Sequence, residues 1–380
     1  MNTGSSCYLV AAVSGRALAQ SAARGGHRVT VLDYFADQDT RAAAEACRCV
    51  VAPHALRFDR RVLLAAAAAL APAAQSAGLV YGSGFEGRTA LLGRLADGRR
   101  LCGNTPEAVS AIRDPRKFFP LLQRLGIAHP EVRFQAPTDS AGWLVKHPGG
   151  AGGAQVRHAS QRPPGGSSYY QRLEAGRTLS VLILADGARA LVLGYNEQWT
   201  MAARPGTPFL FGGAVNHVVL PPELRDAIED RLQALVAATG LVGLNGVDFI
   251  LRDSEWLVLE VNPRPTATVE LYDPDYASGL FDAHLHACAG ELLQAAAPPG
   301  AARAMAVVLA AAGGTLPGEF VFPAWCRDLP APGMRFAAGD PVCTVHAEAP
   351  DAAAAMTLVR RRQASLEQAL FLTSAGPGGS

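Results

Sequence analysis

The stretch "GVDFILRDSEWLVLEVNPRP", residues 246–265, predicts two antiparallel strands joined by a short turn. A three-residue turn from Asp253 to Glu255 sets a register in which Asp248 lies opposite Glu260. Side chains alternate between the two faces of a strand, so Asn262 falls on the same face as Glu260. The opposite face is then wholly apolar, with Val247, Phe249, Leu251, Leu257, Leu259 and Val261. The hairpin is therefore expected to turn two carboxylates and an amide away from the main core.

Two facing carboxylates repel each other unless a positive group lies between them. Mg²⁺ prefers oxygen ligands, usually one or two carboxylates completed by substrate phosphates. Asp248, Glu260 and the amide oxygen of Asn262 supply such oxygens, which predicts a magnesium site. The alternative is that the three are solvated strand-edge residues, since a one-residue slip would reverse their faces.

A second stretch, "LVKHPGGAGGAQV", residues 144–156, places Lys146 at the end of a strand and then four glycines in five positions. Backbone N–H groups without side chains can approach oxyanions closely, so lysine and loop together predict a phosphate site. The lysine precedes the glycines, which excludes a Walker A loop. An ordinary flexible hairpin is the alternative.

The organisation of the chain favours an α/β segment followed by an α+β segment. Strands and helices alternate over residues 1–105, which predicts a parallel sheet covered on both faces. Residues 106–295 begin with two helices and continue with short strands and a long helix from Pro222 to about Thr239. Residues 296–373 form a β-rich segment with a final helix, and 374–380 a disordered tail.

Composition excludes several classes of protein. The 34 basic and 33 acidic residues give a net charge of +1, whereas nucleic-acid binding depends on clustered excess base. Nucleic acid is therefore not an expected partner. No apolar run approaches the length of a membrane span, so a membrane is not an expected partner either. Seven scattered cysteines without a C-x-x-C pair fit reduced thiols in a cytoplasmic protein.

Four motifs follow one another along the chain: "DPRKFFPLLQRLGIAHP", "WLVKHPGGAGGAQV", "YYQRLEAGRTLSV" and the acid-bearing hairpin. In this order they resemble the motifs of the ATP-grasp superfamily. The resemblance covers about residues 105–295, and the N-terminal segment resembles the Rossmann-like pre-ATP-grasp domain. The small β-rich appendage at the C-terminus resembles that of biotin-carboxylase-like proteins. The implied cofactors are ATP and one or two Mg²⁺ ions.

The resemblance implies a role for each matching residue. Lys117 and Lys146 would contact ATP phosphates, with Lys146 and Arg264 as the catalytic residues, because Arg264 matches the arginine that holds the carboxylate or acyl phosphate. Asp248, Glu260 and Asn262 would bind the metal. The loop over the triphosphate would comprise Gly149, Gly150, Gly152 and Gly153. The hinge that reads adenine would comprise Gln171, Arg172, Leu173 and Glu174. This chain departs from the family pattern in two places. Where an acid usually follows the hinge glycine it has Arg177 and Thr178, and Glu174 stands in for that acid. Lys117 lies three residues after Asp114 instead of directly after it.

The implied activity is an ATP-dependent ligase that activates a carboxylate as an acyl phosphate and couples it to an amine. Small-molecule acid and amine substrates are the implied partners, with a homodimer as the assembly considered. "DYFADQDT" and "GSGFE" resemble ATP-grasp proteins of the tetrahydromethanopterin and methanofuran one-carbon pathways, which include a tyramine:glutamate ligase. Ser83 and Glu86 in the latter stretch could contact substrate, because ligands bind where parallel strands end.

Three alternatives stay open from the sequence. The first is an ATP-grasp carboxylase or acid-thiol ligase. The second is a nicotinamide-dependent oxidoreductase, since "AVSGRALA" and Asp33 resemble part of a dinucleotide fold, although with one glycine where the fingerprint has three. The third is a degenerate nucleotide-binding regulator.

Overall fold

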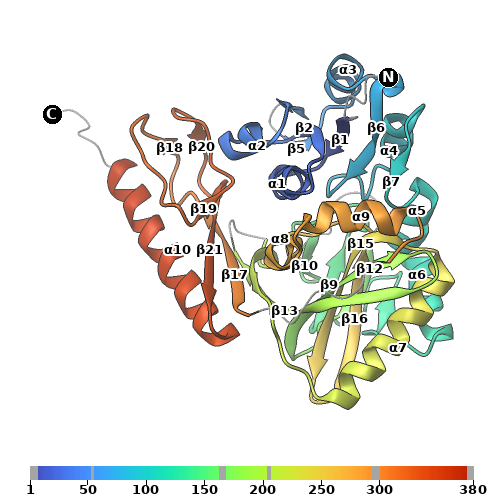
Figure 1. Ribbon diagram of the computed structural model, residues 1–380. Coiled ribbons are helices and arrows are strands. Elements are labelled where there is room, and N and C mark those ends of the chain that lie inside the picture. The colour runs from blue at the N-terminus through green and yellow to red at the C-terminus, as the bar shows by residue number, and fades with distance from the viewer. Residues whose placement is uncertain (1–6, 53–54, 162–167, 203–206, 293–299, 375–380) are drawn as a thin grey trace.

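The N-terminal part of the chain is a parallel sheet with helices on both faces (Figure 1). The computed structural model describes residues 7–52, 55–161, 168–202, 207–292 and 300–374. The sheet has the strand order β3-β2-β1-β6-β7, and its pairings are all parallel. Its strands are β1 (Cys7–Ala11), β2 (Arg28–Asp33), β3 (Ala46–Cys49), β6 (Ser76–Tyr81) and β7 (Leu101–Cys102), and β4 (Val51–Ala52) pairs separately with β5 (Ala55–Phe58). Its helices are α1 (Arg16–Arg24), α2 (Gln38–Ala43), α3 (Arg60–Leu70), η1 (Ala73–Gln75) and α4 (Thr89–Ala96).

Both faces of this sheet are apolar because its strands are buried on two sides. On one face Leu63 of α3 and Leu92 of α4 pack against Leu9. On the other face, Leu18 of α1 and Phe281 of α9 (Gly279–Cys288) share a core with the strands. Helix α9 belongs to a later part of the chain, so the predicted first segment is completed by a helix from the second.

Two helices and a small antiparallel sheet follow. Helix α5 (Pro106–Arg113) has a Thr105 N-cap, and α6 (Pro115–Arg124) has an Asp114 N-cap. A capping side chain before proline at N1 fixes where each helix begins. The sheet has the order β10-β9-β11-β8, formed by β8 (Val132–Arg133), β9 (Trp143–Lys146), β10 (Val156–His158) and β11 (Tyr169–Arg172).

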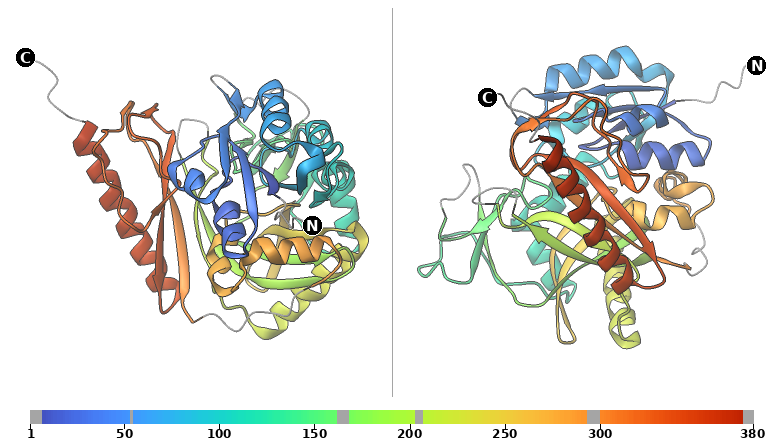
Figure 2. Two further views of the ribbon diagram at one scale, coloured as in Figure 1. Left: turned by 45° about the horizontal axis from the view of Figure 1, so that its top comes forward. Right: turned by 90° about the vertical axis from the view of Figure 1, so that its left-hand side faces the viewer.

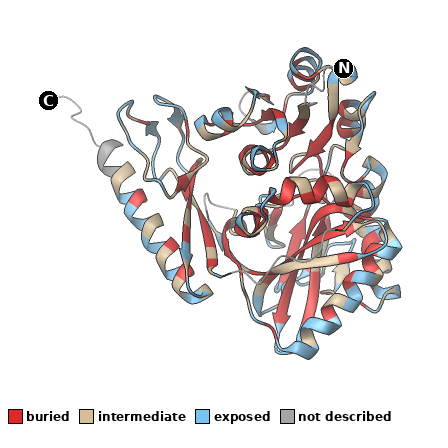
Figure 3. Ribbon diagram, viewed as in Figure 1, coloured by how far each residue is buried: buried red, intermediate tan, exposed pale blue. Residues whose placement is uncertain are grey.

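An eight-stranded sheet forms the centre of the molecule, with most of its inner strands buried (Figure 3). Its order is β16-β15-β12-β13-β14-β17-β21-β19. One face packs against helix α7 (Pro222–Thr239), whose bounds match the prediction, and the other against α8 and α9. The elements are β12 (Arg177–Asp186), β13 (Ala190–Met201), β14 (Leu210–Val215), β15 (Val242–Arg252), β16 (Glu255–Asn262), α8 (Val269–Tyr272), η2 (Asp273–Asp275), β17 (Ala302–Leu309), β19 (Cys326–Arg327) and β21 (Pro341–Ala349).

The β15–β16 hairpin reaches the predicted pairing of Asp248 with Glu260 by a different route. The turn has two residues, because Arg252 pairs with Glu255, and Asp253 has a positive φ of 54°. Such tight hairpin turns need a left-handed residue. The register shifts by one between Asp248 and Phe249, and this bulge restores the opposition of the acids.

The bulge also corrects the predicted apolar face. Val247, Phe249, Leu251 and Val261 lie in the core as expected, joined by Val258. Leu259, by contrast, lines the cavity described below, because the extra residue reverses the alternation.

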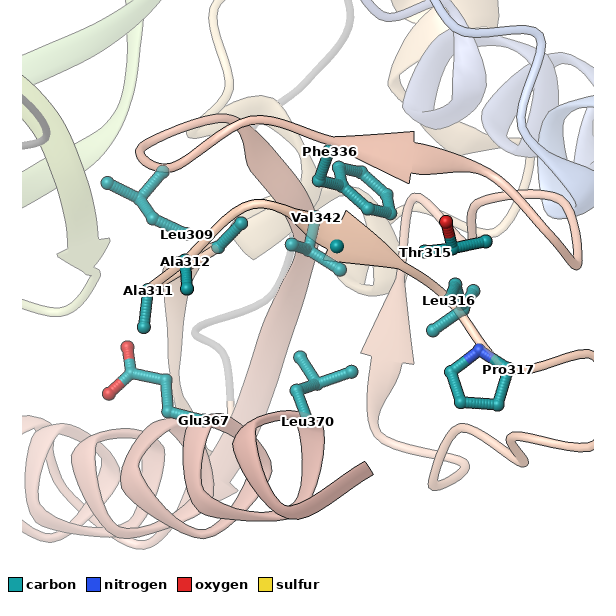
Figure 4. Close-up of a pocket in the computed structure, with 12 residues that line it drawn as sticks. Leu309, Ala311, Ala312, Thr315, Leu316, Pro317, Phe336, Val342, Glu367 and Leu370 are labelled. Carbon is teal, nitrogen blue, oxygen red and sulfur yellow. The ribbon is translucent and has the colours of Figure 1, made fainter. Parts of the chain in front are cut away.

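The C-terminal segment extends the central sheet, because β17 pairs with β14. Helix α10 (Ala352–Ser374) packs on β17 and β21, as both views in Figure 2 show, and β18 (Gly314–Thr315) pairs with β20 (Arg335–Phe336). Ser374, predicted as the first residue of the disordered tail, instead ends α10, and residues 375–380 lie outside the described residues. A cavity of about 60 Å³ lies here, lined mainly by apolar side chains and by Glu367 (Figure 4). That volume is too small for a cofactor.

Buried polar contacts join the three parts. Arg16 of α1 donates to Glu270 at 2.7 Å and to Asp328 at 2.9 Å, which links the N-terminal, central and C-terminal segments. The Tyr81 hydroxyl donates to the carbonyl of Pro263 at 3.1 Å. Within the part of the chain that the structure describes, no helix is long and apolar enough to cross a membrane.

Candidate functional site

A cavity of about 490 Å³ lies between the small sheet, the central sheet and the carboxyl ends of β1 and β6. This volume is in the usual range for a small-molecule site. Its lining includes the predicted residues Lys146, Gly152, Gly153, Gln171, Arg172, Leu173, Glu174, Asp248, Glu260, Asn262, Arg264 and Ser83. The structure therefore brings together residues from three of the four ATP-grasp motifs and from the stretch "GSGFE".

The two carboxylates lie side by side on the central sheet, with Asn262 next to them. Gln198 donates to Asp248 Oδ1 at 3.1 Å, and the Asn262 amide nitrogen donates to Asp248 Oδ2 at 2.8 Å. Burial, and then the charge of Glu260, raise the pKa of Asp248 to about 7. Burial and mutual repulsion oppose the ionisation of this carboxylate pair, and a divalent cation would stabilise its charged form.

The donor set fits a hard cation that keeps other ligands. Among the described residues there is no group of three or more His, Cys, Asp and Glu side chains able to hold a metal. Two carboxylates and one amide must therefore be completed by water or phosphate oxygens, as is usual for Mg²⁺. The Asn262 amide oxygen accepts from Arg264 Nη2 at 3.1 Å, so it would have to turn to become a ligand.

Lys146 lies at the end of β9 and is buried against the same cavity. Burial lowers its pKa, while the nearby carboxylates of Glu260 and Asp248 act in the opposite direction. A buried ammonium beside two carboxylates is a strong point charge for a phosphate oxygen. Lys117, by contrast, is exposed on α6 and does not line the cavity.

Sequence reasoning missed Arg113, the last residue of α5. Its side chain is 7% exposed, and Nη1 donates to Glu260 Oε2 at 2.9 Å. Nη2 donates to the carbonyl oxygen of Gly150 at 2.8 Å. The available signal in the sequence was that Arg113 directly precedes Asp114, the N-cap of α6, and so ends α5.

The glycine loop packs closely on its surroundings. A Cβ on Gly153 would lie 1.7 Å from the carbonyl oxygen of Phe209, and Gly153 has a φ of +82°. The Gly152 carbonyl accepts from the Phe211 N–H at 3.0 Å. A Cβ on Gly87 would lie 2.6 Å from Gly149 Cα, so the loop also touches the N-terminal segment. The glycines are needed here for close approach.

The predicted hinge forms one wall of the cavity with apolar neighbours. Gln171 is fully buried, and neither polar atom of its side chain has a hydrogen-bond partner among the residues that the structure describes. Such groups are costly unless a ligand or water pairs with them. The N–H groups of Arg172 and Leu173 already donate to the carbonyls of Glu131 and Gly142, so only other atoms of these residues are open to a base.

Of three further predicted residues, Glu174 and Glu86 have charged partners of their own. Glu174 lines the cavity and accepts from Arg252 at 3.0 Å. Glu86 is buried and accepts from Arg264 Nε at 2.5 Å, so its carboxylate is already neutralised by an arginine. Ser83 faces the cavity.

Asp33 does not have the free carboxylate that a dinucleotide site would need. One of its oxygens accepts the N–H of Gly15 at 3.1 Å, and the other accepts the N–H of Ala36 at 2.6 Å. Both oxygens thus hold the turn after β1 and β2 in place, and the side chain is fully buried.

Comparison with known proteins identifies the class of domain that surrounds the cavity. The ATP-grasp domain family matches residues 112–268. The carbamoyl phosphate synthase large chain of Rubrobacter xylanophilus is 27% identical over 199 residues, which cover 45% of this chain but only 18% of that protein. The chain therefore contains an ATP-grasp domain.

Two solved structures share this fold over almost the whole chain. The biotin carboxylase domain dimer of Hydrogenobacter thermophilus 2-oxoglutarate carboxylase, in complex with MgADP and bicarbonate, is 12% identical with a TM-score of 0.71. The similarity covers 93% of this chain and 88% of that chain. L-amino acid ligase from Bacillus licheniformis is 16% identical with a TM-score of 0.67, covering 94% and 96%. The predicted combination of α/β and α+β segments in an ATP-grasp fold is confirmed.

Proposed function

We propose that this protein is an ATP-dependent ligase that joins a carboxylic acid to an amine. The observation that carries the proposal is that one cavity gathers Lys146, Asp248, Glu260, Asn262 and Arg264 beneath a glycine loop. Phosphoryl transfer depends mainly on positioning and charge neutralisation, which these groups can supply. The fold of L-amino acid ligase agrees with this activity.

In the proposed reaction the substrate carboxylate attacks the γ-phosphorus of ATP. An acyl phosphate forms and ADP leaves; the amine nitrogen then attacks the acyl carbon, an amide forms and phosphate leaves. Lys146 would neutralise phosphate oxygens and Arg264 would orient the carboxylate. When bound, Mg²⁺ would neutralise charge on the phosphates, held by Asp248, Glu260 and Asn262.

The walls of the cavity suggest how ATP, the acid and the amine are arranged. Leu144, which pairs with Gln171 between β9 and β11, lines the cavity together with Ile250 and Leu259, and these apolar side chains suit an adenine ring. Ser83 and Arg264 also line the cavity, and Trp199 adds an aromatic surface. We place the acid and the amine there. Because Glu86 is paired with Arg264, the amine is expected to use Ser83 and backbone groups instead.

A role in a one-carbon cofactor pathway of the methanofuran type and a cytoplasmic location belong to the same proposal. The pathway depends on the sequence stretches "DYFADQDT" and "GSGFE". The location depends on the cysteine pattern. A homodimer is proposed by analogy with the carboxylase domain dimer.

The test is release of ADP by the purified protein against a matrix of acids and amines, including glutamate with tyrosine, tyramine and furan amines. ADP release that requires one acid and one amine together, with an amide product by mass spectrometry, would support the ligase. Silence with every pair would contradict it.

A carboxylase is the second candidate, favoured by the shared fold with a domain bound to MgADP and bicarbonate. It predicts ADP release that depends on bicarbonate and needs no amine. Replacing the amine by a thiol in the same matrix tests an acid-thiol ligase.

A further inference from the structure

Arg113 connects two parts of the site that are far apart in the sequence. Its guanidinium lies between Glu260 on β16 and the first residues of the glycine loop. Besides Glu260 Oε2 and the Gly150 carbonyl, the Pro148 carbonyl accepts from Nε at 3.2 Å and from Nη2 at 3.1 Å. A single buried cation thus holds one carboxylate and two loop carbonyls.

Only arginine can make this set of contacts. Its guanidinium presents five N–H donors in a rigid plane, whereas a lysine ammonium is a single point on a flexible stem. Burial alone would lower the pKa of Arg113, but the carboxylates of Glu260 and Glu86 hold this pKa above its usual value. Arg113 therefore stays charged, and its bond to Glu260 is a charge-assisted one.

The loop is held on its other side by the N-terminal segment. Gly149, between the two loop residues whose carbonyls Arg113 binds, lies so close to Gly87 that a Cβ on Gly87 would be 2.6 Å from Gly149 Cα. The start of the loop is therefore clamped between Arg113 and the turn after β6. Because the start of the loop packs against Gly87 on one side, loss of the Arg113–Glu260 contact on the other side is expected to change the position of the loop backbone.

We propose that Arg113 is a positioning residue that ties the glycine loop to the carboxylate of Glu260. The loop then takes a position that depends on whether Glu260 is bound by Arg113 or by a cation. This deepens the proposed function, because it couples closure of the loop over a nucleotide to occupation of the carboxylate pair.

Hydrogen exchange of the loop, followed by mass spectrometry on a peptide spanning residues 147–156, tests the coupling without nucleotide or metal. Arg113→Lys and Glu260→Ala are each expected to speed exchange by roughly 10-fold, since a charge-assisted bond is lost. The double variant should be no faster than the faster single variant, because both remove the same link.

The matched control is Arg124→Lys, which changes an exposed arginine on α6 and should leave loop exchange unchanged. Wild-type exchange in Glu260→Ala would overturn the proposal, because Arg113 would then hold the loop independently of the carboxylate. Additive rates in the double variant would overturn it equally. Should Arg113→Lys fail to fold, Glu260→Ala alone decides, because Glu260 is only partly buried.

This experiment is separate from the test of activity. It uses the protein without ATP, so a failed ADP-release assay would refute the ligase and leave the coupling standing. Conversely, an active enzyme with unchanged loop exchange would keep the ligase and remove the coupling.

Discussion

Arg264 Nε donates to Glu86 Oε1 across 2.5 Å, and this ion pair joins the ATP-grasp domain to the N-terminal segment at the cavity wall. Both side chains are buried, with 10% and 4% exposed. Removing one partner of such a pair leaves a buried charge without compensation.

Glu86→Ala is therefore expected to lower the free energy of unfolding by about 3–5 kcal/mol. Urea unfolding followed by circular dichroism measures the loss. Glu255→Ala, which removes an exposed partner of Arg252, is the matched control and should cost at most about 1 kcal/mol. Equal losses in the two variants would show that the Glu86 pair is not desolvated in solution.

Lys146 and Lys117 are expected to separate clearly in kinetics. Lys146→Ala should lower kcat/KM for ATP by about 10²–10³, because a preorganised charge is lost from the site. Lys117→Ala should change it by less than about twofold, since an exposed side chain outside the cavity contributes little. Steady-state ADP release measures both. A comparable loss in Lys117→Ala would bring that lysine back into the site.

The carboxylate pair is expected to be essential for magnesium-dependent turnover. Asp248→Asn and Glu260→Gln should each reduce ADP formation by at least about 10²-fold while the protein stays folded. Glu255→Gln on the same hairpin is exposed and should keep full activity. Unchanged turnover in both cavity variants would refute the metal assignment.

Asp248 makes the stability of the metal-free protein depend on pH. Its folded-state pKa of about 7 lies above the ordinary value of 3.8, because of burial and the charge of Glu260. Folding therefore takes up a proton between these values, and this group's stabilising contribution is lost as pH rises from about 4 to about 7.

Urea unfolding at pH 5 and pH 8 tests this sign. Asp248→Asn should be more stable than the wild type at pH 8, by roughly 2–4 kcal/mol relative to the same comparison at pH 5. Saturating Mg²⁺ with ADP should reduce the difference, because the cation offsets the carboxylate charge. A difference that does not vary with pH would mean that Asp248 stays ionised throughout.

Gly87→Ala is expected to displace the glycine loop. The added Cβ would lie 2.6 Å from Gly149 Cα and 2.9 Å from the Gly149 carbonyl oxygen, and both are backbone atoms that cannot rotate away. We expect a roughly 10-fold loss of kcat/KM, because a small misplacement of the loop is costly. Beyond its chain neighbours, a Cβ on Gly318 would have no atom of the described residues within 4 Å, so Gly318→Ala should be neutral. Wild-type kinetics in Gly87→Ala would show that the loop does not need this contact.

The local patterns of the sequence predicted the fold class and most of the cavity lining. Continuous apolar runs alternating with helices implied the parallel sheet, because strands buried on both faces must be apolar throughout. The opposition of Asp248 and Glu260 could also be predicted, although the turn length was wrong. A compensating bulge is not visible in residue types alone.

The sequence by itself determined that a lysine, a glycine loop and an acid-bearing hairpin exist, since these depend on neighbours a few residues apart. Only the tertiary structure decided which cations reach the cavity. It buries Arg113 against Glu260, leaves Lys117 in solvent and pairs Glu86 with Arg264. The reason is physical: a long basic side chain looks the same in sequence whether its helix turns it inward or outward. The packing of α5 and α6 against the two sheets determines that direction.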